Sequence, residues 1–299
     1  MENVLQALRA AVAYLTQHGV PEARQSAEML LAHVLGCRRL DLYGFPEKPL
    51  GASERARFRA LLRRRARREP VAYILRQAPF YEDLFYVTPA VLVPRPETEH
   101  VVEVVRERAP RDLRRILDIG TGSGCLALTL KRFFPEAEVW AVDVSRRALA
   151  VARKNGRRLN RRVRWAQADV QSPDFLSAQA PFDLIVSNPP YIPLAERPTL
   201  EPELAYEPEE ALFCGEDPLF FYRLILGHLP RLLTPAGLVV LEVHADHGPA
   251  AQRLFQESGW PAHLERDYGG LSRVLWAYRP LEETKRECPR GGAGAGSGR

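Results

Sequence analysis

The sequence predicts an α/β protein with a doubly wound, mainly parallel sheet, preceded by a small helical domain and a β-hairpin linker. Short amphipathic helical patterns fill residues 1–78, and an aromatic, β-branched and proline-containing stretch follows over 79–95. Strand-like and helical runs then alternate over 96–282, a rhythm typical of helices that cover a parallel sheet. Residues 283–299 are rich in glycine and lack core-forming side chains, so we expect a flexible tail there.

The first two helices are predicted from apolar spacing and glycine stops. Apolar residues recur at helical intervals from Val4 to Leu15, and Gly19 follows as a C-terminal cap. A second pattern ends in the same way at Gly36. Because these patterns are short and adjacent, they predict a small bundle rather than one long helix.

A third helical pattern, residues 53–69, is rich in arginine, and Ser53 is expected to cap it. Residues 1–78 carry 14 Lys and Arg against 7 Asp and Glu, whereas 79–299 carry 28 against 30. The basic excess therefore lies in the helical domain. Its arginine face is either solvated or able to make a weak contact with a phosphate backbone, although no bound nucleic acid is required.

Composition excludes several classes of protein. The 299 residues are 46% apolar and 26% charged, which is typical of a globular chain. No window holds 18 consecutive apolar residues, and the start lacks the pattern of a signal peptide, so we expect a cytoplasmic protein without membrane contact. The cysteines form no C-x-x-C pair. His244 and His247 have no third ligand at a suitable spacing, so no metal is expected.

Strands of the main domain are expected at residues 114–120, 137–143, 162–168, 182–188 and 236–243. Helical stretches separate most of them, and Ser145 is the expected N-cap of one. In a sheet of this kind, ligands bind at the carboxyl ends of the strands. The residues that follow each strand are therefore the candidate site.

The first of these strands ends in a glycine-rich turn, Asp118-Ile119-Gly120-Thr121-Gly122-Ser123-Gly124. Glycines let the backbone turn tightly and approach a ligand closely. Asp143 closes the next strand, where its carboxylate can accept hydrogen bonds from both hydroxyls of a ribose. Asp169 follows the third strand and is placed to accept from an adenine amino group. Together these features predict a site for an adenosine-containing ligand.

The fourth strand ends in Asn188-Pro189-Pro190-Tyr191. Each proline holds the residue before it in extended backbone, and neither proline has an N–H. The turn is therefore a stiff segment that presents two acceptors, the Asn188 side-chain oxygen and the Pro189 carbonyl. Such a pair is suited to hold an NH₂ group.

With these motifs, the chain resembles the release factor glutamine methyltransferase family, the HemK-like protein methyltransferases, over about residues 5 to 280. The resemblance also covers Val93-Pro94-Arg95-Pro96-Glu97-Thr98-Glu99, Glu207-Pro208 and the segment 267–273. It implies a class I S-adenosylmethionine-dependent fold, with S-adenosyl-L-methionine as cofactor. The implied reaction methylates the side-chain amide nitrogen of the glutamine in the Gly-Gly-Gln motif of peptide chain release factors, which tunes translation termination.

The resemblance also assigns roles to residues. Asn188, Pro189 and Tyr191 are expected to be catalytic, and with Pro190 they are expected to hold the substrate glutamine. The helical domain is expected to grip the release factor. The expected cofactor-binding residues are Gly120, Thr121, Gly122, Ser123, Gly124, Asp143, Asp169, Val170 and Asn188. Val170 stands where relatives often have an aromatic residue beside adenine, so a weaker adenine contact is expected.

Other activities fit part of the pattern. A ribosomal protein glutamine methyltransferase shares Asn-Pro-Pro-Tyr, but the stretch from Pro94 to Glu99 resembles the release factor branch. A nucleic-acid adenine amino methyltransferase would present a similar NH₂ group by base flipping, although no base-reading domain is evident. A non-enzymatic RNA or ribosome binder would use the arginine-rich helix alone, and it would not need the glycine turn or Asn188.

Overall fold

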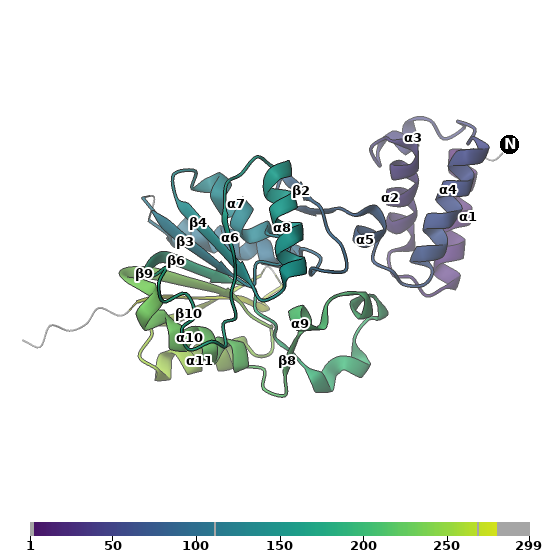
Figure 1. Cartoon of the computed structure of the whole chain (residues 1–299). Helices are drawn as coiled ribbons and strands as arrows, with labels where there is room; N and C mark the ends of the chain where they lie inside the picture. The colour runs from purple at the N-terminus through teal and green to yellow at the C-terminus, as the bar shows by residue number, and fades with distance from the viewer. Residues whose placement is uncertain (1–2, 111, 268, 280–299) are drawn as a thin grey trace, which may run out of the picture.

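The computed structural model describes residues 3–110, 112–267 and 269–279, and the expected tail at 283–299 lies outside them. Five helices at the N-terminus form a bundle that stands beside a sheet-containing unit (Figure 1). We call these helices the helical bundle: α1 (Val4–Gln17), α2 (Ala23–Leu35), α3 (Asp41–Gly44), α4 (Ala52–Arg65) and α5 (Val71–Leu75). None of the helices in the described ranges combines the length and apolar character needed to cross a bilayer.

The helical bundle is held together by its own apolar core. Leu15 of α1 and Leu30 and Leu31 of α2 are completely buried in it. Gly19 and Gly36 follow the ends of their helices with φ of +67° and +65°, the left-handed conformation that glycine adopts without strain. Both predicted helix ends are therefore confirmed.

The arginine-rich helix differs from its prediction at both ends. The helix α4 begins at Ala52, and its N-cap is Gly51, whose N–H donates to the Glu54 carboxylate over 2.7 Å. The prediction that Ser53 caps the helix is therefore wrong, because the side chain three residues after Gly51 caps it instead. The helix ends before residue 69, since the chain takes a left-handed turn at Arg68, with φ of +68°.

A short β-hairpin leaves the helical bundle. Its strands are β1 (Ala78–Phe80) and β2 (Asp83–Phe85), paired antiparallel. The hairpin expected over 79–95 is confirmed in its first part only. After Phe85 the chain continues without forming a further strand as far as Arg95.

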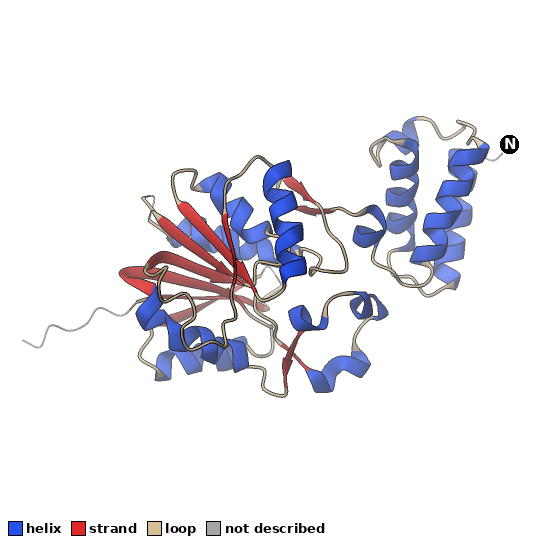
Figure 2. Ribbon diagram, viewed as in Figure 1, coloured by secondary structure: helices blue, strands red, loops and turns tan. Residues whose placement is uncertain are grey.

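The centre of the protein is one sheet of seven strands in the order β10-β11-β9-β6-β3-β4-β5 (Figure 2). The strands from β9 to β5 are parallel, which confirms the predicted doubly wound fold, whereas β10 and β11 add an antiparallel edge that the sequence analysis did not identify. The strands are β3 (Arg115–Ile119), β4 (Glu138–Asp143), β5 (Arg164–Gln167), β6 (Phe182–Ser187), β9 (Leu233–Glu242), β10 (Ala262–Arg266) and β11 (Ser272–Tyr278).

Helices cover both faces of this sheet. They are α6 (Glu99–Arg108), preceded by the 3₁₀ turn η1 (Pro96–Thr98), α7 (Cys125–Phe133), α8 (Arg146–Arg158), α10 (Phe220–Leu232) and α11 (Gly248–Glu257). Alternate residues of a strand point to opposite faces, so Ile116 packs with α6 and α7 while Leu117 packs with α10 and α11. With both faces buried, the central strands are apolar along nearly their whole length.

The chain between β6 and α10 forms a small insertion that lies between the sheet and the helical bundle (Figure 1). It comprises β7 (Ile192–Pro193), η2 (Leu194–Thr199), η3 (Pro202–Tyr206), α9 (Glu209–Leu212) and β8 (Phe213–Gly215). Glu203 of η3 pairs with both Arg65 and Arg68 of the helical bundle, at 2.8 and 2.5 Å. Tyr206 donates to the Arg67 carbonyl over 2.8 Å. Ion pairs and a hydrogen bond therefore join the bundle to the sheet unit, in addition to the covalent linker.

Asn155 of α8 joins three separate parts of the fold. Its side chain accepts from Tyr86 N over 2.7 Å, and it donates to the carbonyls of Tyr86 and Ser123, both over 2.9 Å. Asn155 is completely buried, so each of these groups depends on it for a partner.

We expect Asn155→Ala to lower the free energy of unfolding by about 1 to 3 kcal/mol, the cost of leaving buried backbone groups unsatisfied. Chemical denaturation measures this change. Gln17→Ala, at an exposed helix end, is the control and should change stability by less than about 0.5 kcal/mol. Equal stability of the two variants would contradict the structural role of Asn155.

Candidate active site

The glycine-rich turn after β3 is built from left-handed backbone. Gly120, Gly122 and Gly124 have φ of +72°, +53° and +82°, which explains why glycine stands at all three positions. The N–H groups of Gly120 and Thr121 both donate to the Val142 carbonyl over 2.9 Å, which ties the turn to the neighbouring strand β4. The turn therefore folds back over the carboxyl edge of the sheet.

Asp143 at the end of β4 holds the same turn from the side. One carboxylate oxygen accepts from Gly122 N and the other from Ser145 N, both over 2.9 Å. Burial raises the pKa of Asp143, and the charge of Glu210 raises it further, while the two N–H donors oppose this effect. Ser145 also caps α8 by accepting from Ala148 N over 3.3 Å, as predicted.

Asp118 lies beneath the turn rather than beside it. The side chain is 1% exposed, and one oxygen accepts from Thr121 Oγ1 over 2.6 Å and from Ala127 N over 3.2 Å. The other oxygen has no hydrogen-bond partner among the described residues. Burial, with a contribution from the Asp143 charge, raises the pKa of Asp118 to about 7.

The Asn-Pro-Pro-Tyr turn follows β6, directly beside the glycine turn. Ser187 donates to the Ile119 carbonyl over 2.7 Å, which joins the ends of the two strands. Asn188 donates through Nδ2 to Thr98 Oγ1 over 3.1 Å. Tyr191 donates to Glu242 Oε1 over 3.3 Å. Asn188 and Tyr191 are thus both held from behind by buried polar groups.

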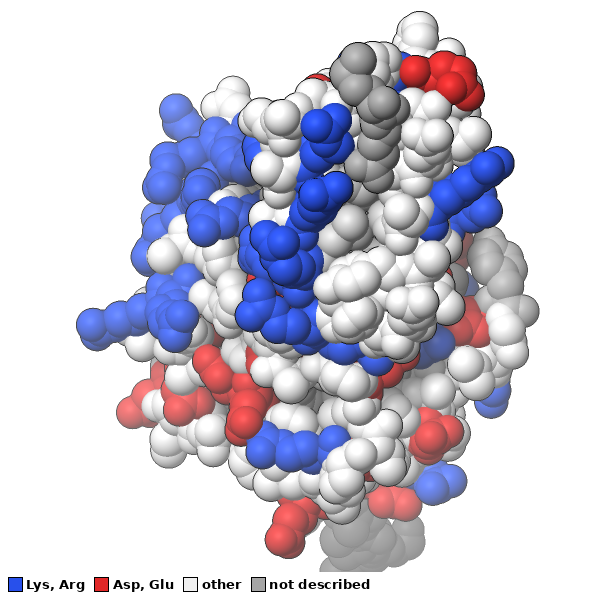
Figure 3. Space-filling view, turned by 90° about the vertical axis from the view of Figure 1, so that its right-hand side faces the viewer, with Lys and Arg blue, Asp and Glu red and all other residues white. Residues whose placement is uncertain are grey.

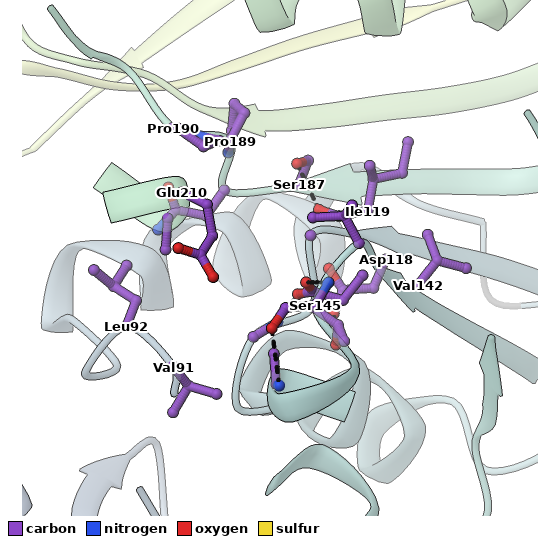
Figure 4. Close-up of a pocket in the computed structure, with 18 of the residues that line it drawn as sticks. Val91, Leu92, Asp118, Ile119, Val142, Ser145, Ser187, Pro189, Pro190 and Glu210 are labelled. Carbon is purple, nitrogen blue, oxygen red and sulfur yellow. Dashed lines mark hydrogen bonds between the residues drawn. The ribbon is translucent and has the colours of Figure 1, made fainter. Parts of the chain in front are cut away.

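A cavity of about 350 Å³ lies over these turns. Figure 4 shows Asp118 and Ser145 on one side, Val91 and Leu92 on another, and Pro189 and Pro190 nearby, with the Glu210 carboxylate directed into the open space. The cavity is lined by most of the predicted cofactor residues, Gly120, Thr121, Gly122, Ser123, Asp143, Asp169, Val170 and Asn188, together with Pro189 and Pro190. We call this the sheet-edge cavity.

Two predicted site residues lie outside the sheet-edge cavity. A Cβ on Gly124 would approach the Trp165 side chain to 3.1 Å, so this glycine serves close packing as well as the turn. Tyr191 instead lines a second cavity of about 700 Å³ between the helical bundle, the insertion and the sheet, which we call the interdomain cavity. Both cavities share five lining residues, Leu92, Arg95, Asn188, Pro189 and Ala211.

Two motifs quoted for the family resemblance contact each other across the fold. Arg95 lies 2.5 Å from Glu207 Oε1, and Val93 N donates to Glu207 Oε2 over 3.0 Å. Glu207 is buried, and burial raises its pKa although the Arg95 charge lowers it. This pair closes the wall between the linker and the insertion.

Three further residues, Thr98, Glu210 and Glu242, lie at the site, although no role was predicted for them from the sequence. Glu242 ends the strand β9 just as Asp143 ends β4, so the strand-end rule applied to Asp143 would also have found Glu242. Thr98 directly precedes helix α6 and Glu210 lies in the short helix α9, so neither stands at a strand end. They line the cavity because the fold brings these helices to it.

The histidine pair forms no evident metal site. His244 and His247 lie with ring centroids 5.1 Å apart. Over the part of the chain that the structure covers, no cluster of three or more His, Cys, Asp or Glu side chains is arranged to hold a metal ion. The ring of His244 lies 5.5 Å from that of Tyr191 instead, and burial lowers the pKa of His244.

Basic side chains gather on the end of the molecule formed by the helical bundle (Figure 3). Arg65 and Arg68 do not belong to this free surface, because they pair with Glu203. Arg64 likewise pairs with Glu69 at 2.5 Å. The predicted basic helix face is therefore partly neutralised by the protein itself, and its weak contact with nucleic acid stays a prediction.

Two family models match the sequence. The PrmC N-terminal domain matches residues 6–75, and the methyltransferase small domain matches residues 97–207. The release factor glutamine methyltransferase of Chlorobaculum tepidum is 42% identical over 283 residues, which cover 91% of this chain and 96% of the relative. The chain belongs to the release factor glutamine methyltransferase family.

Further comparisons agree with this family. A relative of the same name from Geobacter sulfurreducens is 42% identical over 264 residues, covering 88% of this chain and 92% of the relative. A crystal structure of a methyltransferase from Pyrococcus furiosus superposes with a TM-score of 0.50 at 20% identity, covering 66% of this chain and 89% of that one. This superposition confirms the predicted methyltransferase fold, and the sequence relatives confirm the expected family resemblance.

We expect the buried Asp118 carboxyl to make stability depend on pH. Its pKa in the fold is raised from 3.8 to about 7, so the fold binds this proton more tightly than the unfolded chain does. The resulting stabilisation is complete below about pH 4 and is lost as the pH rises through about 7. Asp118→Asn should therefore flatten the dependence of the unfolding free energy on pH over this range, measured by denaturant titration.

Asp174→Asn, at an exposed position, is the matched control and should leave the pH profile of the wild type unchanged. A profile of Asp118→Asn as steep as that of the wild type would show that another buried group, such as Glu242, causes the pH dependence.

Proposed function

We propose that this protein transfers a methyl group from S-adenosylmethionine to the side-chain amide nitrogen of the glutamine in the Gly-Gly-Gln motif of peptide chain release factors. The observation that carries the proposal is the position of the Asn188-Pro189 turn, which forms a common wall of the sheet-edge and interdomain cavities. One cavity suits the methyl donor, and the other suits a protein segment. The names of the family relatives support the choice of substrate.

The sheet-edge cavity suits S-adenosylmethionine. Gly120 and Gly122 leave open space beside the backbone of the turn, and the Asp143 carboxylate is fixed beside it by two N–H donors. Asp143 would accept from the ribose hydroxyls, and Asp169 and Val170 would contact the adenine. Gly120, Thr121, Gly122 and Ser123 would form the floor, with Gly124 shaping the turn. When bound, the cofactor supplies an activated methyl group on a sulfonium.

The Asn188-Pro189 turn would orient the glutamine. A primary amide nitrogen is a poor nucleophile because its lone pair is delocalised, so placement is the main task of the enzyme. The Asn188 side-chain oxygen and the Pro189 carbonyl would accept the two N–H bonds of the amide, and these contacts strengthen as the nitrogen becomes positive. Pro190 keeps the turn stiff. The Tyr191 ring would face the developing cation, an interaction worth about 0.5 to 2 kcal/mol.

The interdomain cavity would receive the loop of the release factor. Its walls come from α2, α4 and α5 of the helical bundle, from the insertion, and from Asn188, Pro189 and Tyr191. Glu203 of the insertion pairs with Arg65 and Arg68 of the bundle beside this cavity, which joins two of its walls. We propose that residues 1–78 recognise the protein substrate and that residues 96–282 carry catalysis.

The decisive experiment is transfer of tritium from labelled cofactor to purified release factor, followed by sequencing of the modified peptide. We expect label on the Gly-Gly-Gln glutamine and none on a release factor in which that glutamine is alanine. Parallel reactions with ribosomal proteins, total RNA and DNA test the rival substrates. Label only on one of these would overturn the proposal.

We expect Asp143→Ala to weaken cofactor binding by about 1.5 to 3 kcal/mol, the range for a charge-assisted hydrogen bond. Calorimetric titration with S-adenosylmethionine measures the change. Asp174→Ala removes an exposed carboxylate elsewhere and should bind the cofactor as the wild type does. Unchanged affinity of a folded Asp143→Ala would remove Asp143 from the cofactor site.

We expect Asn188→Ala to lower kcat by roughly 10² to 10³, the effect of removing one preorganised partner of the transition state. Cofactor affinity should fall much less, because the glycine turn and Asp143 remain. Steady-state methylation of release factor and calorimetry separate the two effects. If the variant methylates release factor at the wild-type rate, the side chain of Asn188 is not an acceptor in the reaction.

A further inference from the structure

A buried polar cluster lies behind the Asn-Pro-Pro-Tyr turn. Thr98, at the junction of η1 and α6, is 2% exposed, and Glu242, at the end of β9, is also 2% exposed. They come from parts of the chain more than a hundred residues apart, and neither belongs to the turn itself. Burial of a carboxylate is costly unless hydrogen bonds compensate for it, so the contacts of Glu242 need an explanation.

Thr98 connects Glu242 to Asn188. Its oxygen accepts from Asn188 Nδ2 over 3.1 Å. The same hydroxyl lies close enough to the Glu242 carboxyl to lower the pKa of Glu242 against the larger effect of burial, and Glu242 Oε2 has no other hydrogen-bond partner among the described residues. A threonine hydroxyl has one proton to donate. Because Asn188 donates to the Thr98 oxygen, the Thr98 hydroxyl proton is left to point to the Glu242 carboxyl group.

Glu242 also holds the other end of the turn directly. Tyr191 donates to its Oε1 over 3.3 Å. The same carboxyl group therefore contacts both the hydroxyl that fixes Asn188 and the hydroxyl of Tyr191.

The contact between Thr98 and Asn188 selects one orientation of the asparagine side chain. A carboxamide has an NH₂ end and an oxygen end of nearly equal size, so packing alone does not distinguish its two orientations. With Nδ2 held by Thr98, the oxygen is left on the other side of the group. Only that orientation offers an acceptor to an amide N–H of the substrate.

We propose that Thr98 and Glu242 are positioning residues, which fix Asn188 with its side-chain oxygen available and hold Tyr191 at the other end of the turn. This inference rests on the proposed function, because it assigns the part of the site that orients the glutamine amide. Thr98 acts on the substrate only through Asn188, and Glu242 acts through Thr98 and Tyr191. The arrangement explains why a costly buried carboxyl group stands behind an otherwise apolar strand end.

The test compares three threonine variants in steady-state methylation of release factor. Thr98→Val removes the hydroxyl and should lower kcat by about 10- to 100-fold with little change in KM, because misorientation affects the reacting geometry. Thr98→Ser keeps the hydroxyl and should restore most of kcat. Thr129→Val is the matched control, because Thr129 is completely buried in α7 and its hydroxyl has no hydrogen-bond partner among the described residues.

A second readout does not depend on activity. The chain contains four asparagines, Asn3, Asn155, Asn160 and Asn188, so selective ¹⁵N-asparagine labelling gives four side-chain NH₂ groups in an NMR spectrum. Asn188→Ala assigns the signal of interest. In Thr98→Val we expect the Asn188 NH₂ signal alone to shift and to exchange faster with solvent, and in Thr129→Val we expect no change.

Glu242→Gln extends the test if Thr98→Val does not fold. It should also lower kcat and shift the Asn188 signal, because an amide replaces one carboxylate acceptor by a donor. The positioning roles are overturned if the wild-type enzyme methylates release factor and either Thr98→Val or Glu242→Gln does so with the wild-type kcat. If the wild-type enzyme does not methylate release factor, the proposed function is overturned instead. In that case the NMR readout still tests the positioning roles, which are overturned if the Asn188 NH₂ signal has the same chemical shift in the variants as in the wild type.

Discussion

The parallel pairing of β3 with β4 on one side and β6 on the other is the constraint on which the site depends. Parallel strands end at the same edge of a sheet, so the turns after these three strands meet although they lie far apart in the sequence. Between β3 and β6 the strand order also reverses direction, which leaves room for a cavity that helices do not fill. The polar groups that the ends of β3, β4 and β6 present to the sheet-edge cavity are placed by this pairing.

Three buried carboxyl groups then join the turns to other parts of the fold. Asp118 holds the start of α7 to the glycine turn, Glu207 joins the linker to the insertion, and Glu242 stands behind the Asn-Pro-Pro-Tyr turn. In each case burial raises the pKa, while hydrogen bonds or the Arg95 charge offset part of the cost. Asp118 Oδ1 and Glu242 Oε2 have no hydrogen-bond partner among the described residues, so this compensation is incomplete at two of the three carboxyl groups.

Sequence reasoning predicted the central architecture because parallel strands and helices leave periodic apolar patterns. It predicted the glycine turn, Asp143 and Asn188 because strand ends in such a sheet share one edge. It did not identify β10, whose mixed polar residues reflect its place at the sheet edge, nor the largely buried strand β11 beside it. It also placed the cap of α4 at Ser53 instead of Gly51. The interdomain cavity and the contact of Thr98 with Asn188 depend on distant segments meeting, which no local pattern encodes.

The shared wall between the two cavities has a kinetic consequence. Apart from five shared residues, the sheet-edge and interdomain cavities are lined by different residues, so the proposed methyl donor and protein substrate would bind side by side. Methyl transfer across this wall would then be a direct displacement within a ternary complex, without a methylated enzyme as intermediate. The two products of such a transfer would likewise lie in separate cavities.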